Sequence, residues 1–124
     1  MKIRESAEDY LESIYMLQMK NGYARSVDIA TQRQVTKASV SIAMKQLREN
    51  DYISMASDGS ITLKDKGMEI AQRIYERHNV LTKMFVALGV DEETAAQDAC
   101  KIEHSLSDTT FNAIKNHVKN QAKA

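Results

Sequence analysis

The chain has 124 residues with 17 basic and 17 acidic side chains, so its net charge is zero when the histidines are neutral. This length predicts one domain, or a compact domain with an extension, and the neutral balance excludes a bulk charge that attracts nucleic acid. The single cysteine excludes an internal disulfide, and no apolar run reaches the ~20 residues that cross a bilayer. We therefore expect a cytoplasmic protein with no membrane partner.

Helix-period apolar patterns dominate the chain and predict a mainly α protein. The first helix is expected from an N-cap at Ser6 to about Gly22, and Ser26 is expected to cap a short second helix. Thr36 is expected to cap the third helix. The residues predicted to face inward in the second and third helices are Val27, Ile29, Ala30, Val40, Ile42, Ala43 and Leu47.

The segment from Tyr52 to Leu63 predicts a β-hairpin, because two short apolar strands flank the turn-forming pair Asp58-Gly59. Two short helices joined by a tight turn and followed by a hairpin form a winged helix-turn-helix. We expect this motif to occupy residues 1–63 as a DNA-binding domain.

Residues 64–124 are expected to be entirely helical. A long helical pattern, either one helix or two joined near His78, ends at Gly89. Asp91 and Ser107 are expected to cap two further helices, the second ending near Val118. The predicted fold class is therefore mainly α, with an N-terminal winged helix-turn-helix followed by an all-helical region.

Basic residues gather in the predicted helix-turn-helix. From Arg25 to Arg48 there are five basic residues against Asp28 alone, which gives a local charge of +4. The second helix of this motif lies in the major groove, and clustered basic side chains neutralise phosphates. The same residues could instead form an ordinary solvated helix face or a protein-binding surface. The residues expected at DNA are Arg25, Lys37, Ala38, Ser39, Ser41, Lys45, Arg48 and Lys64.

Cys100, Glu103 and His104 occur at positions i, i+3 and i+4, so they share one face of a helix. Where three helices meet, such donors can converge on one or two cations. Carboxylates suit Mn²⁺ and Fe²⁺, whereas a thiolate favours softer ions. Each residue also has an ordinary structural interpretation, such as a small buried cysteine or a surface carboxylate. Candidate ligands on two other helices are Asp9, Glu12 and His78.

Five segments carry a family likeness: ESAEDYLESIYML (5–17), GYARSVDIA (22–30), ERHNVL (76–81), LGVDEE (88–93) and IEHSLS (102–107). In this order they resemble the DtxR/MntR family of metal-dependent transcriptional repressors. The resemblance implies an N-terminal winged helix that binds double-stranded operator DNA and a helical metal-binding and dimerisation region over residues 64–124. The length is similar to that of the short, manganese-type members, which have no SH3-like domain.

The resemblance also implies a ligand set with mixed character. Asp9 and Glu12 match the manganese-type members, whereas Cys100 matches the iron-type members. Thr82 and Ala96 stand where the iron-type members have ligands of an ancillary site. The expected cofactor is therefore Mn²⁺ or Fe²⁺, with Co²⁺ or Zn²⁺ as substitutes in vitro. The full set of expected ligands is Asp9, Glu12, His78, Cys100, Glu103 and His104.

The function expected from these features is a metal-activated homodimeric repressor that controls metal-homeostasis genes, in which the metal joins the first helix to the helical region. The main alternative is a metal-independent or redox-switched winged-helix transcription factor. A di-metal enzyme is a second alternative, but the sequence has no glycine-rich phosphate loop, and no small organic substrate is expected. The residues expected at the dimer interface are Met84, Phe85, Leu88, Leu106, Phe111 and Ile114.

Overall fold

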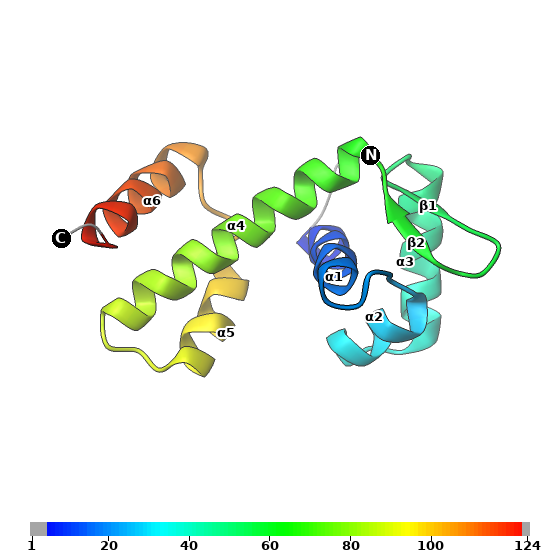
Figure 1. The fold of residues 1–124 in the computed structure, drawn as a ribbon, viewed down its shortest axis with the longest axis horizontal. Coiled ribbons are helices and arrows are strands. Elements are labelled where there is room, and N and C mark those ends of the chain that lie inside the picture. Colours follow the sequence, from blue (N-terminus) through cyan, green and yellow to red (C-terminus); the bar gives the residue numbers. More distant parts are fainter. Residues whose placement is uncertain (1–4, 123–124) are drawn as a thin grey trace. The chain divides into compact units, whose positions relative to one another are not determined.

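The computed structural model describes residues 5–122, and it confirms the mainly α architecture (Figure 1). The chain divides into two compact units, residues 1–73 and 74–124, which we call the N-terminal and C-terminal units. No helix in the described range is long and apolar enough to cross a membrane. The elements in chain order are α1 (Glu5–Asn21), α2 (Ser26–Arg33), α3 (Lys37–Glu49), β1 (Ile53–Met55), β2 (Ile61–Leu63), α4 (Asp65–Ala87), α5 (Glu92–Ile102) and α6 (Asp108–Ala122).

The N-terminal unit has the predicted winged helix-turn-helix. Helix α2 ends at Arg33, and its C-cap Gln34 has a left-handed backbone (φ 57°). Thr36 then caps α3 by accepting a hydrogen bond from the Ser39 N–H. The tight turn from Gln34 to Thr36 joins the two helices, so α2 and α3 form a helix-turn-helix. Strands β1 and β2 follow as an antiparallel hairpin in which Ile53 pairs with Leu63, and this hairpin is the wing.

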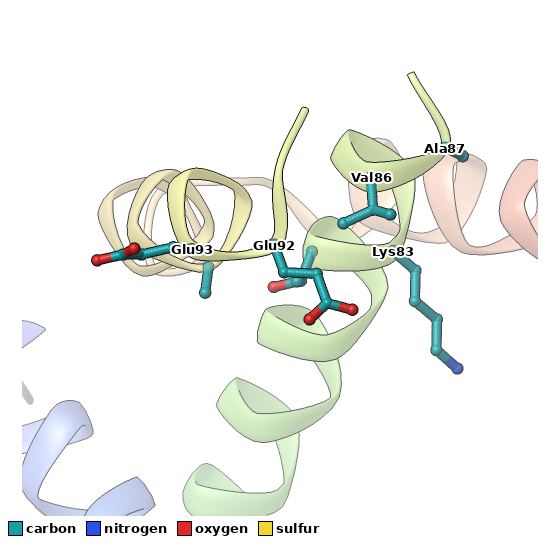
Figure 2. A pocket seen from close by; sticks show the side chains of 7 residues that line it. Lys83, Val86, Ala87, Glu92 and Glu93 are labelled. Atoms are coloured by element: carbon teal, nitrogen blue, oxygen red, sulfur yellow. The ribbon is translucent and has the colours of Figure 1, made fainter. Parts of the chain in front are cut away.

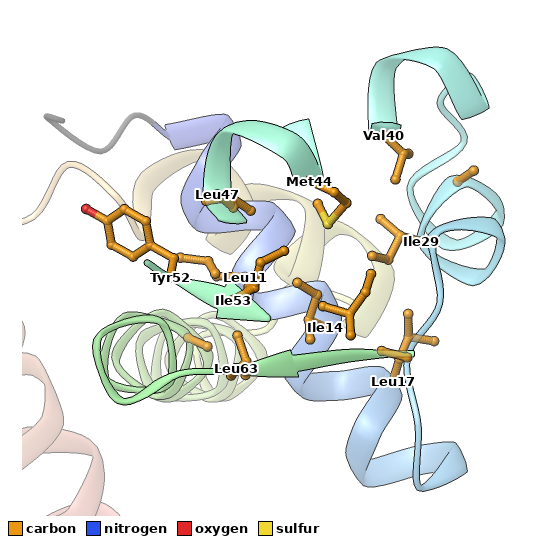
Figure 3. Close-up of a cluster of buried hydrophobic side chains, with 14 residues drawn as sticks. Leu11, Ile14, Leu17, Ile29, Val40, Met44, Leu47, Tyr52, Ile53 and Leu63 are labelled. Atoms are coloured by element: carbon orange, nitrogen blue, oxygen red, sulfur yellow. The ribbon is translucent and has the colours of Figure 1, made fainter. Parts of the chain in front are cut away.

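One apolar core holds the N-terminal unit together (Figure 3). The core forms because α1, α2, α3 and the wing each direct one apolar face inward, at helical or alternating spacing. Its largest members are almost completely removed from water. They are Leu11, Ile14, Leu17, Ile29, Val40, Met44, Leu47, Tyr52, Ile53, Ile61 and Leu63.

Gly67 lies in the first turn of α4, where the helix passes close to the backbone of Tyr52. A Cβ atom at position 67 would lie 2.2 Å from the Tyr52 carbonyl oxygen. The same oxygen accepts a hydrogen bond from the Lys64 N–H at 3.0 Å. Only glycine therefore fits this position without a movement of the backbone.

The C-terminal unit consists of the later part of α4 together with α5 and α6. Asp91 caps α5 by accepting a hydrogen bond from the Thr94 N–H, and the Ser107 hydroxyl accepts one from the Thr110 N–H at the start of α6. Both predicted caps are confirmed. The buried apolar residues of this unit are Ile74, Leu81, Ala95, Ala99 and Phe111.

Several local expectations were wrong. Ser6 lies inside α1, and Ser26 begins α2, whose N-cap Arg25 makes no side-chain cap bond. Val27 and Ile42 were expected to face inward, but their side chains are 48% and 62% exposed. Helix α6 was expected to end near Val118, but it continues to Ala122. For the long helical pattern one helix or two had been expected, and the structure shows the first arrangement, because α4 is continuous through His78.

Candidate metal centre and DNA-binding surface

Three predicted ligands meet in the C-terminal unit. His78 Nδ1 lies 2.9 Å from Glu103 Oε2 and 3.7 Å from Cys100 Sγ. One donor atom from each of the three residues lies within 4.8 Å of the others. An imidazole, a thiol and a carboxylate therefore converge on one small volume, which we call the three-donor cluster.

The local sequence explains this arrangement. His78 lies in α4, while Cys100 is in the last turn of α5 and Glu103 is the C-cap of that helix. The Glu103 N–H donates to the Ala99 carbonyl at 2.9 Å, so helical geometry persists to the capping residue. The spacing of three residues then places both side chains on the same face of α5, as the sequence predicts.

Glu103 is an unusual residue because its carboxylate is completely buried. Its side chain is 0% exposed, and Oε1 has no hydrogen-bond partner among the described residues, although His104 Nε2 lies 3.5 Å away. A buried carboxylate with an unused lone pair is costly unless a proton or cation approaches it. The oxygen is thus available to a cation.

Hydrogen bonds to Cys100 and Glu103 raise the pKa of His78 to about 10, and partial burial opposes this rise only in part. The imidazole therefore carries a proton at neutral pH when no metal is bound. That proton balances the buried carboxylate of Glu103. A metal ion that binds to His78 has to displace this proton.

Arg77 fixes the backbone beside the cluster, a role that sequence reasoning missed. Its Nη1 donates to the carbonyls of Glu103 at 3.2 Å and Leu106 at 2.6 Å, and its Nη2 pairs with Asp108 at 2.6 Å. The guanidinium also lies 5.1 Å from the centroid of the Phe111 ring. The only signal in the sequence was a basic residue directly before His78.

The donor set fits a divalent transition metal. Imidazole and carboxylate are common ligands of Mn²⁺ and Fe²⁺, and the thiolate of Cys100 shifts the preference toward Fe²⁺, Co²⁺ or Zn²⁺. The observation that favours a cation here is the buried Oε1 of Glu103, which accepts no hydrogen bond from the described residues. Three donors leave room for further ligands, since most sites of this kind have four or more.

The remaining predicted ligands have different surroundings. Asp9 and Glu12 belong to α1 in the N-terminal unit, where a carboxylate oxygen of each lies within 4.8 Å of the other. Asp9 Oδ2 also forms a salt bridge with Arg33 Nη2 of α2 at 3.1 Å. His104 follows Glu103 directly, and only 4% of its side chain is exposed.

All eight predicted DNA-contacting residues are exposed. Several of their charges have acidic neighbours that lie outside the basic segment of the sequence. Arg25 pairs with Asp58 at 4.0 Å, and Lys45 pairs with Glu49 at 4.0 Å. Exposed pairs of this kind are weak, so both cations remain available to phosphates.

The predicted interface residues differ in exposure. Leu88 is 75% exposed, whereas Phe111 is only 5% exposed and packs beneath Arg77. Near Leu88 an open pocket of about 700 Å³ lies between the end of α4 and the start of α5 (Figure 2). The residues that line it are Thr82, Lys83, Val86, Ala87, Glu92, Glu93 and Ala96.

Comparison with known proteins agrees with this geometry. Residues 2–61 match the family model of the iron dependent repressor N-terminal DNA binding domain, and residues 64–123 match that of its metal binding and dimerisation domain. The HTH-type transcriptional regulator MntR of Bacillus subtilis is 38% identical over 88% of this chain and 77% of its own length. This chain belongs to the DtxR/MntR family of metal-dependent transcriptional repressors. A further HTH-type transcriptional regulator, from Methanocaldococcus jannaschii, is 35% identical over 90% of each chain.

Solved structures share the fold of the family. IdeR of T. acidophilum covers 94% of this chain with a TM-score of 0.80 and 24% identity, and the manganese regulator SloR covers 91% with a TM-score of 0.81 and 24% identity. This chain spans 55% and 53% of the lengths of those two chains. The DtxR/MntR relatives are transcriptional regulators rather than enzymes.

Proposed function

We propose that the chain is a homodimeric repressor that binds operator DNA when Mn²⁺ or Fe²⁺ is bound, and that it controls metal-homeostasis genes. Residues 1–63 form the DNA-binding domain in this proposal, and residues 64–124 form the metal-binding and dimerisation domain. The observation that carries the proposal is the three-donor cluster of His78, Cys100 and Glu103, found in a member of a metal-dependent repressor family.

The residues that would hold the ion are the three-donor cluster together with Asp9, Glu12 and His104. A bound divalent cation supplies positive charge that compensates the carboxylates and the thiolate. Glu103 offers a buried oxygen that has no hydrogen-bond partner among the described residues, His78 gives up its proton, and Arg77 keeps the backbone of Glu103 in place. The family resemblance, rather than the three-donor cluster, is the support for Asp9 and Glu12.

Ligands on α1 would explain how metal binding reaches the DNA-binding surface. In the N-terminal unit α1 packs against both α2 and α3. A constraint on Asp9 and Glu12 would therefore constrain the recognition helix α3. In a dimer, two recognition helices held about one turn of DNA apart, ~34 Å, reach two half-sites together. The ion favours DNA binding only as far as it binds more tightly to that arrangement.

The dimer is proposed to form through the C-terminal unit. The family model that covers residues 64–123 describes a dimerisation domain. Leu88 and Val86 are exposed apolar residues at the end of α4 and support an interface there. We retain Met84, Phe85, Leu106 and Ile114 as further interface candidates.

The test is DNA binding by the full, chelator-stripped chain at fixed salt. The protein is titrated separately with Mn²⁺, Fe²⁺ under anaerobic conditions, Zn²⁺ and Co²⁺ against fragments of its own genome. One or two of the metals are expected to produce tight binding. Equally tight binding in chelator would contradict the proposal.

Matched variants connect this result to the site. Cys100→Ser and Glu103→Gln are expected to abolish or strongly weaken the metal response. Glu93→Gln removes a carboxylate from the same helix outside the cluster, and it is expected to leave the response unchanged. If all three variants showed the same metal response, the three-donor cluster would not be the metal site.

One observation favours a second candidate function. Cys100 is an exposed thiol 3.7 Å from His78, an arrangement that also suits a redox-switched regulator. In that case peroxide would change the DNA affinity of the chelated wild-type protein. It would not change the affinity of Cys100→Ser.

A further inference from the structure

Ile42 is the most exposed isoleucine of the described chain, and it lies on the recognition helix α3. Its side chain is 62% exposed, although its apolar character predicts a core residue. Single exposed apolar residues are common on protein surfaces. The position of Ile42 on the helix is what distinguishes it.

The geometry of α3 places Ile42 at the centre of the outward face. The buried residues of α3 are Val40, Met44 and Leu47, which define the face that packs on the core. Ile42 is two residues from Val40 and two from Met44, and is therefore about 200° around the helix from each. It points directly away from the core of the N-terminal unit.

The residues around Ile42 form a defined outward line along α3. Ala38 is four residues before Ile42 and Lys45 is three residues after it, and both are exposed. Residues at these spacings are neighbours on the surface of a helix. Glu49 continues the line and pairs with Lys45, so its negative charge limits the DNA-facing part to the first nine residues of α3.

Small and apolar side chains on a recognition helix have one specific partner in the major groove. Thymine is the base that presents a methyl group there, and apolar side chains contact that group. Lys37, Ser39 and Ser41 provide hydrogen-bond donors on either side of the outward line. On the outward line, the side chains of Ala38 and Ile42 have no hydrogen-bond donor.

We propose that Ile42, with Ala38 beside it, reads a thymine methyl group in each half-site of the operator. This inference rests on the proposed function, because it requires that α3 enters the major groove. It assigns to Ile42 a role in sequence specificity that differs from the phosphate contacts expected of Lys45 and Arg48. It also explains why an isoleucine remains exposed in the middle of this helix.

The experiment uses the full chain loaded with its activating metal. A bound sequence is first selected from random duplex DNA, and each thymine is then replaced singly by deoxyuridine, which removes only the methyl group. At one position in each half-site, wild type is expected to lose roughly fourfold in affinity, the worth of one buried methyl group. Ile42→Ala is expected to bind the two DNAs equally.

Two variants serve as controls. Val27→Ala removes an apolar side chain that is 48% exposed on α2, and it is expected to keep the wild-type ratio between the thymine and deoxyuridine DNAs. Lys45→Ala is expected to weaken binding to every sequence and to reduce the salt dependence, again with the ratio retained. Thermal unfolding checks that Ile42→Ala remains folded.

The outcomes separate this inference from the proposed function. Metal-dependent DNA binding with the same ratios in wild type and Ile42→Ala would overturn the role of Ile42 and leave the repressor proposal intact. That outcome is also expected if Ile42 instead binds a protein partner. The absence of DNA binding with every metal would overturn both proposals.

Discussion

The two units of this protein are stabilised in different ways. The N-terminal unit has a continuous apolar core to which α1, α2, α3 and the wing all contribute. In the C-terminal unit the buried apolar residues are fewer, and two of them are alanines. Both units bury charged side chains, but these form a larger share of the small C-terminal interior, where Arg77 is 5% and Glu103 is 0% exposed. In the N-terminal unit Glu8 (7%) and Glu12 (3%) accompany a much larger apolar core.

This difference indicates which unit has a stability that depends on bound metal and on a partner subunit. An apolar core stabilises itself, whereas buried charges stabilise a fold only when all their partners are present. The N-terminal unit can therefore remain a constant DNA-reading module. The stability of the C-terminal unit is expected to change with metal and with dimerisation, as a regulatory region requires.

The largest expected effect is that of Arg77→Ala. The substitution removes the donor from the carbonyls of Glu103 and Leu106. A buried acceptor left without a partner costs ~1–3 kcal/mol, and the part-buried Leu106 carbonyl costs less than the buried Glu103 carbonyl, so we expect a total loss of roughly 2–4 kcal/mol. Amide hydrogen exchange should report the loss in α5 and α6 and leave α2 and α3 protected.

Asp108→Asn is the matched control for Arg77. The Asp108 side chain is 83% exposed, so its ion pair with Arg77 is expected to contribute only ~0–1 kcal/mol. A similar loss of protection in both variants would show that the ion pair, and not the carbonyl contacts, holds the segment.

Metal addition should increase the difference in stability change between the two units. At a metal concentration about one hundred times Kd, binding to the folded state adds about 2.7 kcal/mol of stability. We expect the added protection in α4 and α5, which hold the three-donor cluster, and in α1, which carries Asp9 and Glu12. Little change is expected in the wing. An equal increase in Glu103→Gln would contradict the site.

Gly67→Ala tests the packing of the N-terminal unit. Helix propensity alone favours alanine by ~1 kcal/mol. The new Cβ would lie 2.2 Å from the Tyr52 carbonyl oxygen, and such overpacking costs about 1–3 kcal/mol. Urea unfolding should therefore show a net destabilisation, whereas Glu69→Ala, an exposed change two residues later, is expected to be nearly neutral. A stabilised Gly67→Ala would refute the close approach.

Rising pH is expected to increase metal affinity and to decrease the folding stability of the metal-free protein. Because the pKa of His78 is raised to about 10 in the folded state, its stabilising effect is complete below about pH 6.5 and is lost as the pH rises toward 10. Metal binding displaces the same proton, so metal affinity should rise about tenfold per pH unit between roughly pH 6 and 8. Calorimetric titrations at several pH values measure this slope. His78→Gln should reduce it, and an unchanged slope would contradict the role of His78.

Local signals in the sequence were sufficient for most of the fold. Thr36, Asp91 and Ser107 were recognised as N-caps because capping depends mainly on neighbouring residues. The same signal misplaced the caps at Ser6 and Ser26. The orientation of a helix is a tertiary property and was harder to predict. Val40 and Ile42 are similar in hydrophobicity, and only the packing of α3 determines that one is buried and the other exposed.

The candidate site was predictable in part for the same reason. The spacing of Cys100 and Glu103 is a local feature, and the meeting of these residues with His78 follows from the packing of α4 on α5. The anchoring role of Arg77 depends on backbone carbonyls, which no residue pattern reveals. The salt bridge between Asp9 and Arg33 joins positions too far apart in the sequence to be predicted from spacing.

The most direct test of the central claim is the affinity of the activating metal, measured with and without saturating operator DNA. Coupling between two ligands is reciprocal, so a metal that strengthens DNA binding must itself bind more tightly by the same factor when DNA is present. We predict an increase of about 5–150-fold, the usual range of such coupling, and its loss in Glu103→Gln. Equal metal affinity in the two conditions would contradict the account, because the metal would then have no means of controlling DNA binding.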